Sequence, residues 1–381
     1  MDPTVELACE LIRCRSVTPD DGGCQEIIGG RLAAAGFEVE NLRFGEVDNL
    51  WAVYGDAGPT LCLLGHTDVV PPGPLEDWQS DPFEPRIDDG KLFGRGAADM
   101  KSSVAAMVTA AERYAAVHSP EHGRLAILLT SDEEGPGIHG VRRVMEAFGE
   151  RGTRIDWCLV GEPSCQTALG DTVKHGRRGS LTGRIRLRGQ QGHVAYPTLA
   201  ENALHHLLRI VTPLVDHDWG PGDADFPPSS FQISNLNAGT GADNVIPGVA
   251  DVCFNIRYNP GLPREAIKQV VSTACESAGF APGDTRLELD WHHSGDPFIT
   301  REGPLLDALE QSIRAVCGGR PARSTAGGTS DGRFVAPAGA QVAEFGPLNA
   351  SIHKVDEHVL VDDLPRLSEV YEQTISRLLV G

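Results

Sequence analysis

Residues 60–68 read TLCLLGHTD, an apolar run that leads into a glycine, a histidine and, two residues later, an aspartate. Two similar runs follow, LAILLT at 125–130 and WCLV at 157–160. Continuous apolar runs of this length are typical of strands that are buried on both faces, as in a largely parallel sheet. Residues 101–118, between the first two runs, have helical spacing, so this part of the chain predicts an α/β arrangement.

The pattern changes near residue 180, where apolar and basic residues begin to alternate. The segments that follow predict a helix, two strands, a helix and a strand, at 202–215, 230–236, 249–258, 264–278 and 285–292. With the strand at 180–188, this βαββαβ order is that of a ferredoxin-like α+β domain. We therefore expect a catalytic domain in two parts, 1–179 and 293–381, interrupted by an inserted domain at 180–292.

The composition describes a globular protein of two domains. The chain has 381 residues, of which 40% are hydrophobic and 23% charged, and its net charge is -20. That charge argues against nucleic acid and anionic membrane surfaces as partners, and no apolar stretch is long enough to span a membrane. The first 19 residues lack the apolar core of a signal peptide, and the nine scattered cysteines form no CxxC pair. We expect reduced thiols in a cytoplasmic protein.

Polar residues follow each predicted strand. His66 comes after the first, Glu133 and Glu134 after the second and Glu162 after the third, while Asp99 precedes the helix. Because ligands bind outside the carboxyl ends of the strands in open α/β sheets, we expect these side chains at one rim. Crowded carboxylates repel one another unless a cation lies among them, and histidine with carboxylates suits Zn²⁺, Co²⁺ or Mn²⁺. A bridging aspartate could hold two ions about 3.5–4 Å apart, as in two-metal hydrolases.

A second motif suggests different chemistry. Residues 328–332 read GTSDG, which matches the GxSxG nucleophile elbow, and Asp356 and His358 follow in hydrolase order. The elbow requires a buried strand directly before Ser330, but residues 320–327 are polar and rich in glycine. We therefore disfavour a serine hydrolase.

Further motifs extend over nearly the whole chain. The widely distributed ones are GHTDVVPPG (65–73), GRGAADMK (94–101) and TSDEEG (130–135), and the more specific ones are KHGRRGSL (174–181), GQQGHVAYP (189–197) and STAGGTSDGRF (324–334). In these motifs the chain resembles the bacterial succinyl-diaminopimelate desuccinylases, of the di-zinc aminoacylase/carboxypeptidase superfamily. It departs from their pattern at 201–204 and at Cys165, both beside the expected site.

The resemblance implies a zinc-peptidase-like catalytic domain with a mixed sheet and two zinc ions per subunit, for which cobalt or manganese could substitute. One ion would be held by His66, Asp99 and Glu162, and the other by Asp99, Glu134 and His353. Glu133 would be the general acid and base. Asp68 would accept the ring N–H of His66.

The resemblance also implies a homodimer with shared active sites, in which the inserted domain serves for dimerisation and as a lid. His193 would reach the partner subunit's site and stabilise the oxyanion. The residues that match substrate contacts of the family are Arg178, Asn244, Arg257, Ser294, Thr325, Gly328 and Asn349.

The implied reaction is hydrolysis of the amide bond of N-succinyl-LL-2,6-diaminopimelate to succinate and LL-2,6-diaminopimelate, in lysine and diaminopimelate biosynthesis. One alternative is an acetylornithine deacetylase-like enzyme, which we disfavour because a neutral acetyl group needs no guanidinium. The other is an inactive dimeric binding scaffold, which we disfavour because Glu133 and all five expected ligands are present.

Overall fold

The computed structural model describes all 381 residues and divides the chain into two compact units. The larger unit consists of residues 1–176, 299–324 and 330–381, and the smaller unit of residues 177–298 and 325–329. The predicted limits of the inserted domain, 180 and 292, lie inside the smaller unit. The five residues 325–329 also belong to the smaller unit, although the sequence pattern assigns them to the second part of the catalytic domain. No helix has the combination of length and apolar character that a bilayer span requires.

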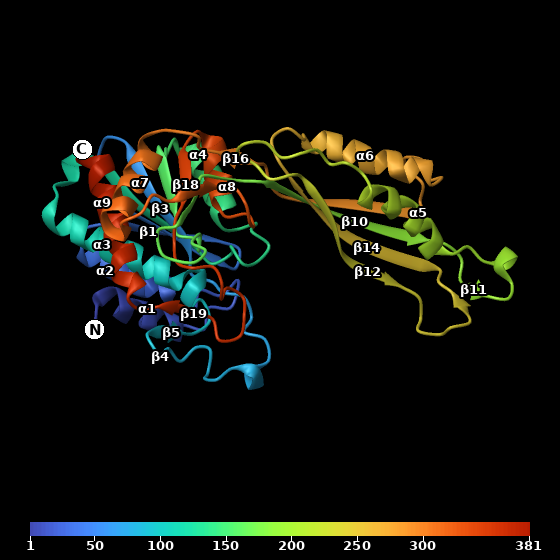
Figure 1. Ribbon diagram of the computed structural model, residues 1–381, viewed down its shortest axis with the longest axis horizontal. Coiled ribbons are helices and arrows are strands. Elements are labelled where there is room, and N and C mark those ends of the chain that lie inside the picture. Colours follow the sequence, from blue (N-terminus) through green and yellow to red (C-terminus); the bar gives the residue numbers. More distant parts are fainter. The chain divides into compact units, whose positions relative to one another are not determined.

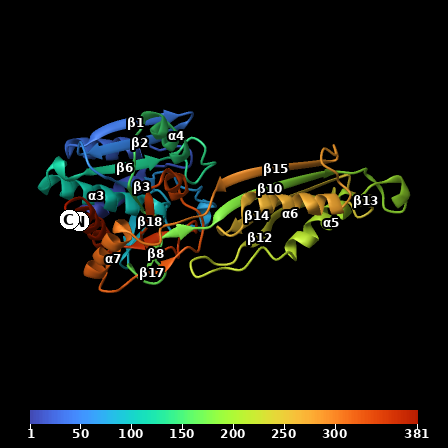
Figure 2. The ribbon, with the colours of Figure 1, turned by 90° about the horizontal axis from the view of Figure 1, so that it is seen from above.

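An eight-stranded mixed sheet forms the centre of the larger unit, which confirms the predicted fold class. Figure 2 shows four of its strands, β1, β2, β6 and β3, side by side. In spatial order the strands are β1 (Glu38–Phe44), β2 (Val47–Tyr54), β6 (Arg124–Thr130), β3 (Thr60–His66), β7 (Trp157–Val160), β18 (Gln341–Glu344), β8 (Thr172–Lys174) and β17 (Ala322–Ser324). The four strands from β6 to β18 are parallel to one another. Their carboxyl ends therefore meet at one edge of the sheet.

Helices cover both faces of this sheet (Figure 1). One face carries α1 (Pro3–Arg13), α2 (Cys24–Ala34), α3 (Ser102–Val117), α7 (Pro304–Cys317) and α9 (Asp363–Leu379), and the other carries α4 (Val141–Arg151) and α8 (Gly332–Val335). Every residue of β3 is buried, which explains why its sequence is a continuous apolar run rather than an alternating one. A separate small sheet consists of β19 (His358–Leu360), β5 (Lys91–Phe93) and β4 (Arg86–Asp88).

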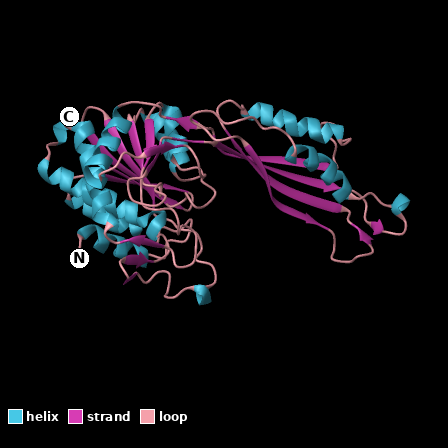
Figure 3. Ribbon diagram, in the orientation of Figure 1, coloured by secondary structure: helices cyan, strands magenta, loops and turns pink.

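The smaller unit is a four-stranded antiparallel sheet with two helices on one face (Figure 3). The strands, in spatial order, are β12 (Ser230–Ala238), β14 (Val249–Tyr258), β10 (Gly179–Arg188) and β15 (Leu287–Gly295), and the helices are α5 (Ala203–Val215) and α6 (Arg264–Ser277). This is the split βαββαβ arrangement of ferredoxin-like domains. Along β10, Leu181, Ile185 and Leu187 are buried against the helices, while the arginines between them are exposed. Because only one face of β10 is buried, its apolar and basic residues alternate along the chain.

Two short pairs of strands complete the chain. The antiparallel pair of β11 (Gly192–His193) and β13 (Val245–Ile246), which are separated in the chain by α5 and β12, extends the smaller unit beyond its main sheet (Figure 1). The chain passes between the units through β9 (Gly176–Arg177) and β16 (Phe298–Ile299).

Candidate functional site

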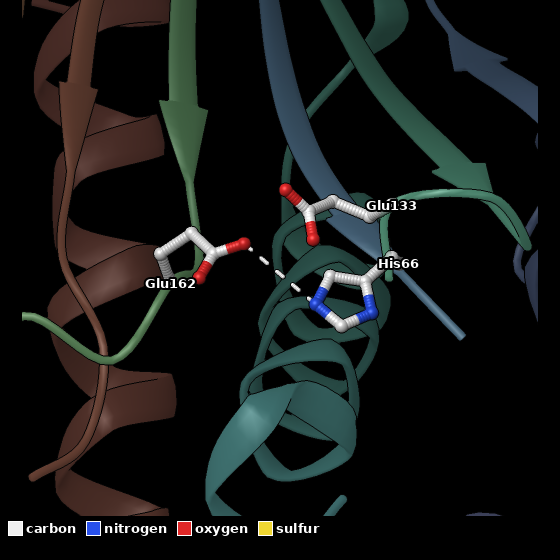
Figure 4. A group of neighbouring side chains, drawn as sticks. All are labelled: His66, Glu133 and Glu162. Carbon is white, nitrogen blue, oxygen red and sulfur yellow. Dashed lines mark ion pairs between the residues drawn. The ribbon is translucent and has the colours of Figure 1, made fainter. Parts of the chain in front are cut away.

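A histidine and two carboxylates meet where β3 and β7 end. His66 is the last residue of β3, and its Nε2 lies 3.1 Å from Asp99 Oδ1 and 3.7 Å from Glu162 Oε1. Figure 4 shows the ring of His66 facing the carboxylates of Glu162 and Glu133. Parallel pairing of β3 with β7 brings His66 and Glu162 to the same edge of the sheet.

Asp99 lies between two histidines. While its Oδ1 faces His66, its Oδ2 lies 3.5 Å from Nε2 of His353. The same nitrogen of His353 lies 2.9 Å from Glu134 Oε1. Each oxygen of Asp99 thus faces one imidazole, and each imidazole has a further carboxylate beside it. The five residues that the resemblance implies as metal ligands are thus gathered in one cluster.

The second ring nitrogen of His66 has its own partner. Nδ1 lies 2.8 Å from the backbone carbonyl oxygen of Asp68 and 3.6 Å from its Oδ1. Because a carbonyl oxygen only accepts, Nδ1 carries a hydrogen, and Nε2 is the ring nitrogen that faces Asp99 and Glu162. With its hydrogen on Nδ1, the ring can offer the lone pair of Nε2 to a metal ion held among these carboxylates. That is the orientation in which metal-ligating histidines are held.

The carboxylate of Asp68 makes contacts that the sequence did not predict. It accepts the backbone N–H groups of Glu133 at 3.3 Å and of Glu134 at 3.1 Å. The predicted partner, the ring N–H of His66, is nearer to the backbone carbonyl of Asp68 than to this carboxylate. The Asp68 carboxylate therefore fixes the backbone of the segment that carries Glu133 and Glu134.

The charges of the cluster match a cation site. Hydrogen bonds that the protonated ring donates to Asp99 and then Glu134 raise the pKa of His353 to about 10. Burial, and then the negative charge of Asp99, raises the pKa of Glu162 well above its ordinary value. Proton binding thus offsets the crowded negative charge in this cluster. Two sets, His66 with Glu133 and Glu162, and His66 with Asp99 and Glu134, place their ligand atoms within 4.8 Å of one another. Imidazole and carboxylate donors at this spacing fit divalent metal ions.

Glu133 is half-buried and lies among charged groups. Burial, and then the negative charge of Asp331, raises its pKa to about 8. Its Oε1 lies 3.7 Å from Nη1 of Arg333, whose Nη2 lies 3.5 Å from Asp331 Oδ1. Arg333 and Asp331 were not singled out as site residues from the sequence. They lie at 331 and 333, within the motif STAGGTSDGRF (324–334). Of the residues in this motif, only Thr325 and Gly328 were expected to contact the substrate.

The GTSDG motif does not form a catalytic triad. The hydroxyl of Ser330 is buried and donates to the carboxylate of Glu344. The carboxylate of Asp356 accepts both the backbone and the side-chain N–H of Gln79, and Nδ1 of His358 lies 2.8 Å from the backbone oxygen of Asp356. No hydrogen bond connects the side chains of Ser330, Asp356 and His358.

The model of peptidase family M20/M25/M40 matches residues 62–377. The chain belongs to this family. Proteins named succinyl-diaminopimelate desuccinylase from Thioalkalivibrio sulfidiphilus and Alkalilimnicola ehrlichii are 54% and 55% identical to it over 380 and 379 residues, which is 100% of this chain and of each relative.

Solved structures of the M20 family share the fold at low sequence identity. An M20 family metallo-carboxypeptidase from Sulfolobus solfataricus superposes with a TM-score of 0.86 at 16% identity, covering 100% of both chains. A dinuclear metal-binding M20 peptidase from Bacillus subtilis superposes with a TM-score of 0.71 at 15% identity, covering 98% of this chain and 97% of its own. The fold expected from the sequence is therefore the one that these M20 structures share.

His193 and Asn244 of this M20-family chain lie at the β11–β13 strand pair of the smaller unit, His193 as the last residue of β11 and Asn244 directly before β13. His193 is exposed, and its Nδ1 accepts the backbone N–H of Ala195 at 3.0 Å. A neutral ring with Nδ1 as acceptor carries its hydrogen on Nε2, so that nitrogen is an available donor. The backbone N–H of Val194 donates to the carbonyl of Asn244 at 3.0 Å, directly beside the pairing of His193 with Val245.

The predicted substrate contacts are distributed over both units of the M20 chain. Arg178 and Ser294 are next to Gly179 and Gly295 at one end of the smaller sheet, where Arg257 pairs with Ser180. The half-buried guanidinium of Arg178 donates to a backbone carbonyl at 3.0 Å. Thr325 and Gly328 belong to the same unit.

Asn349 belongs to the larger unit, which also contains all five predicted metal ligands. Its backbone N–H donates to the carbonyl of Cys165 at 3.0 Å. The position of Asn349 is thus tied to the segment that follows Glu162.

Proposed function

We propose that this chain hydrolyses the amide bond of N-succinyl-LL-2,6-diaminopimelate to give succinate and LL-2,6-diaminopimelate. The observation that carries the reaction class is Asp99, which lies between two imidazoles, each with a further carboxylate, beside the half-buried Glu133. The substrate is supported by relatives with this activity in their names, which are 54% and 55% identical over 100% of their length.

We propose zinc as the metal, because two histidines with carboxylates form the donor set that zinc prefers. His66, Asp99 and Glu162 would hold one ion, and Asp99, Glu134 and His353 the other. When bound, such ions act as Lewis acids on a carbonyl oxygen and lower the pKa of a water molecule toward about 7. Cobalt or manganese accepts the same donors and could substitute.

Glu133 has no place among these five ligands, and we assign proton transfer to it. Its carboxylate takes the proton of the attacking water and returns it to the leaving amine. The carboxylate of Asp68 accepts the backbone N–H groups of Glu133 and Glu134. These hydrogen bonds fix the backbone from which both side chains extend.

The substrate carries several carboxylates, and we assign their recognition to Arg178 and Arg257, which form charge-assisted hydrogen bonds. Their neighbours in this role are Asn244, Ser294, Thr325, Gly328 and Asn349. We further propose a cytoplasmic homodimer, in which the smaller unit serves for dimerisation and as a lid. In this dimer the Nε2–H of His193 of the partner subunit stabilises the oxyanion.

Measurement of succinate release tests the proposal directly. The purified chain, loaded with zinc, is incubated with N-succinyl-LL-2,6-diaminopimelate and, separately, with N-acetylornithine. We expect hydrolysis of the succinyl substrate at a kcat/KM far above that for the acetyl substrate. The E133Q variant is the control for contaminating activity. Preferred hydrolysis of the acetyl substrate would transfer the assignment to the acetylornithine deacetylase-like alternative.

A further inference from the structure

We propose that Glu357 is a positioning residue of the metal centre, which sets the position of Asp99 and thereby the affinity for metal. This inference rests on the proposed metal ligands, but it concerns a residue outside them. Glu357 is 1% exposed and comes four residues after His353 in the chain.

The carboxylate of Glu357 accepts three backbone N–H groups from the loop that carries Asp99. Its Oε2 accepts the N–H of Gly96 at 3.1 Å, and its Oε1 accepts those of Ala98 at 2.8 Å and Asp99 at 3.0 Å. In addition, the backbone oxygen of Glu357 accepts the N–H of Gly94 at 3.0 Å. One residue thus provides hydrogen-bond acceptors along most of this loop.

The loop needs such a partner because its backbone is irregular. Asp99 has φ -123° and ψ 96°, which is outside the helical region, although α3 begins three residues later. Gly96 has φ 81°, a left-handed conformation that glycine adopts without strain. Buried N–H groups in such a loop have no helical acceptors, and leaving them unpaired is costly. Glu357 satisfies them and in doing so fixes the backbone from which the Asp99 carboxylate extends.

Arg95 connects this arrangement to two further loops. Its Nη1 donates to Glu357 Oε2 at 2.6 Å and to the backbone oxygen of Lys354 at 3.2 Å. Its Nη2 donates to the backbone oxygen of Pro72, in the loop that follows Asp68, at 3.4 Å. The buried pair of Arg95 and Glu357 therefore connects the loop of Asp99 with that of His353 and with the chain beyond β3.

The consequence concerns geometry at both ions. Asp99 is the one proposed ligand that directs an oxygen to each of the two histidines, so a small rotation of its backbone displaces both contacts. Residues that orient metal ligands typically change metal affinity about 10–100-fold when they are replaced.

The test uses the E357Q variant of the full-length chain. Glutamine keeps the size of the side chain but replaces one acceptor oxygen with an N–H₂ group, which cannot accept the N–H groups of the loop. We expect zinc binding by titration calorimetry to weaken about 10–100-fold for at least one ion. Metal content after dialysis should fall correspondingly.

A matched control is D171N. Asp171, in the same unit, also accepts three backbone N–H groups, those of Gln166, Thr167 and Ala168, but it lies in a turn with no proposed ligand. D171N should lower the thermal stability of the metal-free chain and leave zinc affinity unchanged. Zinc affinity of E357Q equal to that of wild type would overturn the proposal.

Two conservative variants keep the test decisive if E357Q does not fold. E357D keeps the charge with a shorter reach, and R95K keeps the cation but loses the fork of two N–H₂ groups. Both should bind zinc more weakly than wild type, and unchanged affinity in both would overturn the role of Glu357. A wild-type chain that binds no pair of ions would instead contradict the proposed metal centre.

Discussion

At the scale of single residues, the site combines five proposed metal ligands with Glu133, which is proposed to transfer protons and not to bind metal. His66, Asp99, Glu134, Glu162 and His353 face one another across distances of 2.9–3.7 Å. Four of these five were predicted from their positions at strand ends or before a helix. His353 was expected only through the resemblance, because it lies in a loop, with φ 59°, that has no periodic pattern. Glu357 was missed, since a side chain that accepts backbone N–H groups has no sequence signature.

The first prediction concerns Glu133. E133Q should lower kcat about 10²–10⁴-fold, because the amide cannot transfer the proton that the carboxylate transfers. Zinc content should remain near two ions per chain, since Glu133 is not one of the five proposed ligands. Measurement of kcat and of metal content on the same preparation tests both statements, and activity within a few-fold of wild type would remove the assigned role.

At the scale of elements, the strands that could be located from the sequence are those whose burial leaves a clear pattern of apolar residues. The strands β3, β6 and β7 were located from their apolar runs because both of their faces are covered, so that nearly every residue is apolar. The short strands β8 and β17 were not predicted, since three residues such as Ala-Arg-Ser carry no period and depend on their neighbours for pairing. In the smaller unit, one-sided burial made the alternation visible.

The turn at residues 166–171, directly before β8, gives a pH-dependent prediction. Partial burial favours the neutral form of Asp171, but the N–H groups of Thr167, Gln166 and Ala168 outweigh it and lower the pKa to about 2. A depressed pKa stabilises the fold above the ordinary pKa of about 4, and this contribution disappears as the pH falls toward 2. D171N should therefore cost about 1 kcal/mol of unfolding free energy at pH 7. Urea unfolding should show the difference from wild type shrinking between pH 4 and pH 2, whereas a constant difference would contradict this origin.

At the scale of the whole molecule, the shared-site proposal raises a testable question, namely which chain supplies His193 to a given site. A mixture of H193A and E133A chains answers it. If the site is shared between subunits, a heterodimer has one site that lacks both groups and one that lacks neither, so activity returns after subunit exchange. If His193 serves its own chain, every site lacks one group and no activity returns. Exchange itself is verified with differently tagged chains, and loss of an oxyanion donor alone should cost about 10²–10³-fold in kcat.

The division of the larger unit into three sequence segments has a consequence for the nascent chain. The smaller unit lies almost entirely in the continuous stretch 177–298, whereas β7 pairs on one side with β18, whose residues 341–344 come near the end of translation. During synthesis β7 therefore has an unpaired edge while the smaller unit can already fold on the ribosome. The histidine at 353 emerges later still, so the ligand cluster can be completed only when translation is almost finished. A chain interrupted before residue 341 would have an exposed parallel strand and an incomplete set of ligands.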